Sequence, residues 1–131
     1  MGFVRSLSLA VVFGLMMATG SAQAEGDPAN GAKVFNKCKA CHELKTEKNK
    51  VGPHLVQILG RVAGSIEGFN YSSALKKAHA EGLVWTEEHL AKFVANPKAF
   101  LPGNRMAFAG LKNEKEIADL IAYMKQEAGD S

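Results

Sequence analysis

The feature that most constrains this chain is the stretch Cys38-Lys39-Ala40-Cys41-His42. Two cysteines separated by two residues, with a histidine directly after the second, form the attachment signature for a c-type haem. Each thiol can add across one vinyl group to make a thioether, and the histidine can present a ring nitrogen to the iron. The motif therefore predicts one haem c, attached covalently through Cys38 and Cys41, with His42 as an iron ligand.

The N-terminal residues have the pattern of a secretory signal peptide. Arg5 supplies a positive charge, an apolar run extends from Leu7 to Met17, and Ala22-Gln23-Ala24 is an A-x-A cleavage site. The apolar run is shorter than the ~20 residues that cross a bilayer, so cleavage is favoured over an uncleaved membrane anchor. We predict that residues 1–24 are removed and that residues 25–131 form a single mono-haem domain in the periplasm.

Other uses of two nearby cysteines have to be compared with haem attachment. An exported chain reaches an oxidising compartment, where a disulfide between Cys38 and Cys41 would persist. A thiol–disulfide oxidoreductase would be expected to show a strand–helix–strand context, which the sequence lacks. A zinc site is disfavoured because His54 follows Cys41 at finger-like spacing without a second histidine shortly after it. Haem attachment is preferred, and the haem-free oxidoreductase remains the competing hypothesis.

Composition excludes one class of partner. The sequence has 16 Lys and Arg against 13 Asp and Glu, a net charge of +3, and removal of Arg5 would lower it further. Such a weak positive charge does not indicate nucleic-acid binding, for which a strongly basic surface is expected. The length fits one domain, and no internal repeat or linker divides the chain.

Helix-starting residues and apolar spacing predict an all-α fold, and no alternating strand pattern is present. Asp27-Pro28 opens the first helix, with Gly31 allowing close approach of the last one. The expected fold has three principal helices, shorter helical pieces and long loops around the cofactor. Its other predicted helices are a short one from Ser72 or Ser73 to Gly82, one capped by Thr86 and ended by Asn96-Pro97, a short piece from Pro97 to Phe100, and one capped by Asn113 that runs to about Ala128.

Two methionines lie beyond residue 24, and their contexts differ. Met124 belongs to a helical apolar stripe with Leu120 and Ile121, which indicates core packing. Met106 lies in a loop rich in proline and glycine, outside any such stripe. The residues alone favour Met106 as the second iron ligand, while a gap-filling core methionine is the alternative.

Two further residues are candidates to support the haem. A ligand histidine usually donates its other ring N–H to a carbonyl or carboxylate, and the carbonyl of Pro53 is suited to accept it. The guanidinium of Arg61 can pair with a haem propionate, with a solvated surface arginine as the alternative. His54 is expected to be a structural histidine, exposed or hydrogen-bonded.

Taken together, these residues resemble class I cytochrome c, most closely the bacterial cytochrome c2 and mitochondrial cytochrome c group. The resemblance covers nearly all of Gly26 to Ala128. It rests on Gly31 with Phe35, the haem motif, Gly52-Pro53, Gly60-Arg61, Gly68-Phe69-Asn70-Tyr71, Trp85, Asn96-Pro97, the stretch from Pro102 to Gly110, and Asp119-Leu120-Ile121-Ala122-Tyr123.

The resemblance implies roles for individual residues. It makes Cys38 and Cys41 the thioether anchors, and it adds Met106 to His42 as an axial ligand. The residues placed around the haem are Pro53 as carbonyl acceptor, Tyr71 and Trp85 as propionate hydrogen-bond donors with Arg61 nearby, and Phe108 beside the haem edge. Phe93 is a departure, because mitochondrial proteins have a tyrosine there whose hydroxyl reaches the axial sulfur.

The implied function is one-electron transfer, without enzymatic activity, by a soluble monomer. Both axial positions would be filled, and a neutral thioether raises the potential relative to two imidazoles. The implied partners are a quinol–cytochrome c reductase and a terminal oxidase or photosynthetic reaction centre. Exposed cations are expected to steer acidic partners to the haem edge, namely Lys37, Lys98, Arg105 and Lys112. A haem-based ligand binder or peroxidase-like enzyme, in which Met106 dissociates, is the alternative.

Overall fold

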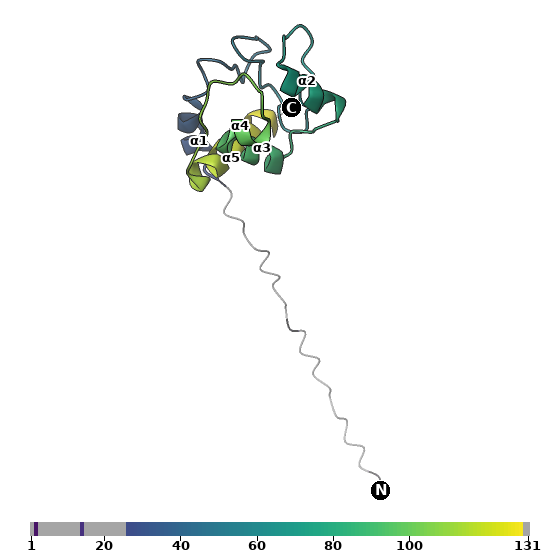
Figure 1. The fold of residues 1–131 in the computed structure, drawn as a ribbon. Coiled ribbons are helices and arrows are strands. Elements are labelled where there is room, and N and C mark those ends of the chain that lie inside the picture. The colour runs from purple at the N-terminus through teal and green to yellow at the C-terminus, as the bar shows by residue number, and fades with distance from the viewer. Residues whose placement is uncertain (1, 3–13, 15–25, 130–131) are drawn as a thin grey trace.

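The structure is a computed structural model that describes residues 2, 14 and 26–129. The predicted signal peptide, apart from Gly2 and Gly14, lies outside the described residues. The helices are α1 (Pro28–Phe35), α2 (Ser73–Ala80), α3 (Glu87–Ala95), α4 (Pro97–Phe100) and α5 (Glu114–Gly129) (Figure 1). The described residues form no sheet, only an isolated bridge between Val62 and Val84. None of the helices in this part of the chain has the length and apolar character needed to cross a membrane.

The helices begin where the capping residues predicted. The side chains of Asp27, Ser72, Thr86 and Asn96 each accept a hydrogen bond from a backbone N–H in the first turn of α1, α2, α3 and α4. Asn113 accepts from two N–H groups at the start of α5. These bonds satisfy donors that a helix start otherwise leaves without partners. The predicted helix starts are confirmed.

The chain leaves α1 in a tighter turn than an α-helix. α1 ends at Phe35, and the N–H of Cys38 donates to the carbonyl of Phe35 at 2.8 Å. The N–H of Cys41 then donates to the carbonyl of Cys38 at 3.1 Å. Bonds between residues three apart belong to 3₁₀-type turns, which have three residues per turn.

α1 packs across α5, as Gly31 predicted (Figure 1). A Cβ at Gly31 would collide with the backbone carbonyl of Asp119 and would lie 2.7 Å from the Cβ of Tyr123. The rings of Phe35 and Tyr123 lie next to this crossing, with centroids 5.8 Å apart. The two helices can therefore approach this closely only because residue 31 has no side chain.

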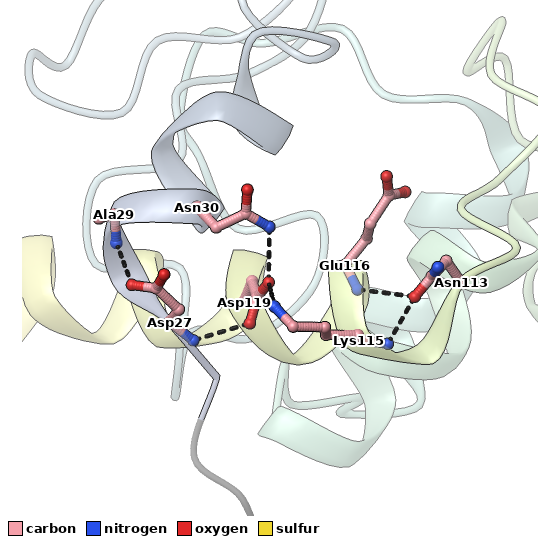
Figure 2. Close-up of polar contacts among 7 residues, drawn as sticks. All are labelled: Asp27, Ala29, Asn30, Asn113, Lys115, Glu116 and Asp119. Carbon is pink, nitrogen blue, oxygen red and sulfur yellow. Dashed lines mark hydrogen bonds and ion pairs between the residues drawn. The ribbon is translucent and has the colours of Figure 1, made fainter.

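A buried carboxylate joins the same two helices (Figure 2). Asp119 is 1% exposed and accepts hydrogen bonds from the backbone N–H of Asp27 at 2.7 Å, Asn30 Nδ2 at 2.6 Å and Lys115 Nζ at 2.7 Å. Hydrogen bonds from Lys115, then Asn30, then the Asp27 backbone lower the pKa of Asp119 from its usual 3.8 to about 2. The charge is buried but fully supplied with donors, so it holds the start of α1 onto α5.

The core lies between α1, α3 and α5 and extends under the loops. Met124 is 3% exposed within it, which confirms that this methionine is a packing residue. Trp85 is also buried and contacts two rings, with centroids 5.0 Å from Phe93 and 6.2 Å from Phe100. Its other buried members are Val34, Phe35, Leu44, Ile58, Ala63, Ala78, Leu90, Val94, Leu111, Leu120 and Ile121.

Candidate functional site

The attachment segment, residues 38–42, forms a compact turn. The carbonyl of Cys38 accepts hydrogen bonds from the N–H groups of Cys41 at 3.1 Å and His42 at 2.9 Å. Both cysteines are partly exposed and free rather than joined in a disulfide. Burial, reinforced by the neighbouring Cys41, raises the pKa of the Cys38 thiol, so its sulfur is protonated at neutral pH.

The ring of His42 is oriented by its neighbours. Its Nδ1 lies 2.8 Å from the carbonyl oxygen of Pro53, which can only accept, so Nδ1 carries the proton and Nε2 keeps its lone pair. Burial lowers the pKa of His42, which keeps the imidazole neutral. Gly52 packs against the ring, where a Cβ would lie 2.7 Å from Nδ1. The contact between His42 and Pro53 is present as predicted.

Residues 50–55, which we call the strap, hold the attachment segment along its length. The ammonium group of Lys50 donates to the carbonyl of Lys39 at 2.7 Å, and the N–H of Gly52 donates to the carbonyl of Cys41 at 2.8 Å. Farther on, the N–H of Leu55 donates to the carbonyl of Glu43 at 2.7 Å. With the bond to His42, the strap fixes both the backbone of this segment and the imidazole of His42.

Met106 lies in the methionine loop, residues 101–111, and is half-buried. Its backbone N–H donates to Asn104 Oδ1 at 2.9 Å. The loop closes on α3 through the N–H of Leu111, which donates to the carbonyl of Val94 at 2.7 Å. Asn104 is not among the residues predicted for the site, although an asparagine that bonds to a backbone N–H two residues on is a known turn former.

Arg61 and Trp85 lie side by side. The backbone N–H of Trp85 donates to the carbonyl of Arg61 at 2.8 Å. The guanidinium of Arg61 donates to the carbonyls of His54 and Val56. Arg61 is therefore half-buried and not a solvated surface arginine, and burial lowers its pKa. The indole N–H of Trp85 has no hydrogen-bond partner among the described residues, so it is available to a ligand. The side chain of His54 is buried, and its Nδ1 accepts a hydrogen bond from the backbone N–H of Val56 at 3.3 Å, so His54 is a hydrogen-bonded and not an exposed histidine.

Tyr71 lies in a segment that is bonded to the methionine loop, and Phe108 belongs to that loop. The hydroxyl oxygen of Tyr71 accepts from the N–H of Ile66 at 3.1 Å, so its own proton remains free to be donated. Arg105 donates to the carbonyl of Asn70 at 2.8 Å, which ties the loop to the segment that holds Tyr71. Phe108 packs against the core, and its N–H donates to the carbonyl of Met106 at 3.0 Å.

These groups fit a c-type haem. The free thiols of Cys38 and Cys41 lie on one turn. The imidazole of His42 follows directly, and its Nε2 is free for a metal. The indole N–H of Trp85 and the hydroxyl proton of Tyr71 remain for propionate oxygens. No cluster of three or more metal-binding His, Cys, Asp or Glu side chains exists among the described residues.

Comparison with known proteins decides the family. The family model for cytochrome c matches residues 28–128. The chain belongs to the cytochrome c family. It is 57% identical over 99 residues to a cytochrome c-550 of Ancylobacter novellus, a match that covers 75% of this chain and 92% of that protein. A cytochrome c2 of Agrobacterium tumefaciens (strain II Chrys) is 50% identical over 101 residues, which is 76% of this chain and 91% of that protein.

The fold has a solved counterpart. The structure of cytochrome cH from Methylobacterium extorquens matches with a TM-score of 0.70 and 44% identity, over 77% of this chain and 99% of that chain. The chain thus has the all-α class I cytochrome c fold. As a cytochrome c it carries covalent haem c through its two cysteines, Cys38 and Cys41, and it is an electron-transfer protein and not an enzyme. The haem-free oxidoreductase is thereby excluded.

Proposed function

We propose that this cytochrome c is a soluble, periplasmic one-electron carrier in which His42 and Met106 are the axial ligands. Haem c supplies, when bound, a reversible exchange between ferric and ferrous iron. The observation that carries the proposal is the orientation of His42, whose Nδ1–H is held on the Pro53 carbonyl so that Nε2 is left for a metal. Met106 is the one methionine of residues 26–129 that is not committed to the core.

The chain's own residues would hold the cofactor in a fixed environment. The strap fixes the imidazole and the attachment segment, so neither has to reorganise when the charge changes. Tyr71 and Trp85 have donors left for propionates, and Arg61 adds a positive charge that is anchored by two carbonyls. A thioether carries no charge, so Met106 favours the reduced state more than a second imidazole would.

The proposed location rests on the N-terminal pattern of Arg5, the apolar run and Ala22-Gln23-Ala24. Cleavage after Ala24 would release a protein that begins at Glu25. N-terminal sequencing of the protein purified from a periplasmic fraction tests this, and an intact N-terminus in the membrane fraction would contradict it.

The proposed partners are membrane redox complexes, a quinol–cytochrome c reductase on one side and a terminal oxidase or photosynthetic reaction centre on the other. Lys37, Lys98, Arg105 and Lys112 are all exposed and would steer acidic partners into brief encounters. Such redox interfaces bury less than about 1,200 Å² in total, and the carrier itself would be a monomer. Turnover with acidic partners should slow as salt rises, and salt-independent exchange would contradict steering by these cations.

The decisive experiment is the near-infrared spectrum of the oxidised protein. Methionine bound to ferric haem gives a weak charge-transfer band, which should be present and should vanish in Met106→Ala. A covalent haem without this band in the wild type would show that Met106 is no ligand. Carbon monoxide binding to the reduced wild-type protein at neutral pH would likewise indicate an open iron site.

A further inference from the structure

Asn104 uses both polar atoms of its side chain inside the methionine loop. Its Nδ2 donates to the carbonyls of Pro97 and Leu101, each at 2.8 Å, and its Oδ1 accepts the backbone N–H of Met106 at 2.9 Å. The side chain of Asn104 therefore links α4 to the backbone of Met106. Asn104 is half-buried, which limits competition from water for these bonds.

The sequence around Asn104 explains why a side chain makes the bonds across this turn. Pro102 has no N–H, and Gly103 adopts φ +88°, so the chain turns sharply away from α4. α4 is a single turn, Pro97–Phe100, after which the N–H of Leu101 donates to the carbonyl of Pro97 at 3.0 Å and the N–H of Asn104 donates to the carbonyl of Leu101 at 3.2 Å. The amide of Asn104 adds a second donor to each of these two carbonyls and at the same time binds the chain beyond the turn.

The side chain of Met106 cannot be oriented in the way that His42 is. A thioether is at most a weak hydrogen-bond acceptor, and methionine has three rotatable side-chain bonds. Its direction is therefore set by packing and by the path of its backbone. Two other side chains fix this loop, Arg105 on Asn70 and Lys112 on the carbonyls of Ala95 and Ala109, but both are exposed.

We propose that Asn104 is a positioning residue that keeps the Met106 sulfur on the haem iron and thereby excludes competing ligands. This inference rests on the proposed function, because it takes Met106 as an axial ligand. It assigns to Asn104 a role in ligand retention that is separate from its contribution to folding. Removing the side chain would free the Met106 N–H and would leave the carbonyls of Pro97 and Leu101 with one backbone donor each, so the loop would open more often.

Imidazole added to the oxidised holoprotein is a direct probe of this opening, because it can bind the iron only when the sulfur has left. In Asn104→Ala we expect the apparent Kd for imidazole to fall at least about tenfold, which corresponds to about 1.4 kcal/mol. The methionine-to-iron band should weaken in parallel. Asn104→Asp keeps the acceptor for the Met106 N–H but loses both donated bonds, so its Kd should fall by less than that of Asn104→Ala.

Asn113→Ala is the matched control, since it also removes an asparagine that binds two backbone groups, but at the start of α5. It should lower the stability to denaturant without changing the imidazole Kd. An unchanged Kd in Asn104→Ala, or in Asn104→Asp if the alanine variant does not accumulate, would overturn the proposal. An equal fall in Asn113→Ala would also overturn it, since the effect would then be one of global stability. Absence of the band in the wild type would instead refute the ligation by Met106.

Discussion

The attachment segment, which the strap holds in place, and the methionine loop carry the two proposed iron ligands, and these ligands are held in different ways. On the strap side the ligand ring itself is held, with Pro53 bound to Nδ1 and Gly52 packed against the ring face. On the methionine side the bonds made by Asn104 reach only backbone atoms. The imidazole of His42 is thus held by contacts to the ring itself, whereas the thioether of Met106 is held only through the backbone that carries it. We therefore expect ligand exchange to begin at Met106.

The largest effect should come from Gly52→Val, on the strap side. Any Cβ at residue 52 would collide with the imidazole ring of His42, and the bulk of valine has no space there. Overpacking typically costs about 1–3 kcal/mol, and here the displaced group is the proposed ligand, the imidazole of His42. We expect a severe loss of low-spin holoprotein, measured as covalent haem per polypeptide and by the visible spectrum.

The neighbouring Val51→Ala is the control for this variant, because Val51 is 79% exposed. It should yield holoprotein like the wild type. A normal spectrum in Gly52→Val would show that the ring is held less tightly than the structure indicates, and the contrast between the two regions would disappear.

Met106→Ala should have a smaller effect, because attachment and the proximal imidazole depend on the other region. The variant should keep its covalent haem and helical fold, lose the methionine-to-iron band and bind carbon monoxide when reduced. Its reduction potential should be lower than that of the wild type, since loss of the thioether removes a ligand that favours the reduced state. A variant that failed to retain haem would mean that the two regions are not independent.

A third region, the contact between α1 and α5, should determine acid stability. The pKa of Asp119 is lowered from 3.8 to about 2, so the folded state resists protonation of this carboxylate. Its contribution to the free energy of unfolding is complete above about pH 4 and is lost as the pH falls from there toward 2. Denaturant unfolding at several pH values should show this loss in the wild type.

Asp119→Asn should be less stable at neutral pH, because an amide binds Lys115 and Asn30 less well than a carboxylate does. Its stability should also change less between pH 4 and 2. If the stability of the wild type and of Asp119→Asn fell equally between pH 4 and 2, the acid sensitivity would belong to other groups. The strap and the methionine loop would then be the next regions to test for acid sensitivity.

Much of this fold and site follows from local patterns in the sequence. The spacing of Cys38, Cys41 and His42 indicates the attachment chemistry, and the capping residues mark the helix starts. Apolar periodicity separates Met124 from Met106. Each of these signals involves residues close together in the chain, for which sequence spacing fixes spatial placement.

Contacts between distant segments could not be predicted in the same way. Asp119 bonds with residues about ninety positions earlier, and the sequence does not show which carboxylate will face α1. The sequence predicts that Arg61 pairs with a propionate, but it does not show that two of the five guanidinium donors bind the carbonyls of His54 and Val56. A side chain with several donors has several possible partners, and the fold decides among them.

The smallest predicted effect concerns the charge of Lys50 on the strap side. Its ammonium group is held on the carbonyl of Lys39, between the two cysteines, so a positive charge stays beside the attachment segment. Such a charge disfavours the more positive ferric state, and Lys50→Met should therefore lower the reduction potential. The residue is exposed, so we expect a shift below about 59 mV, the value of a tenfold change for a one-electron couple.

Lys48→Met removes the same charge from an exposed lysine without such a bond among the described residues, and should shift the potential less. Equal shifts in the two variants would show that the strap fixes only geometry and that its bound charge has no special influence on the iron.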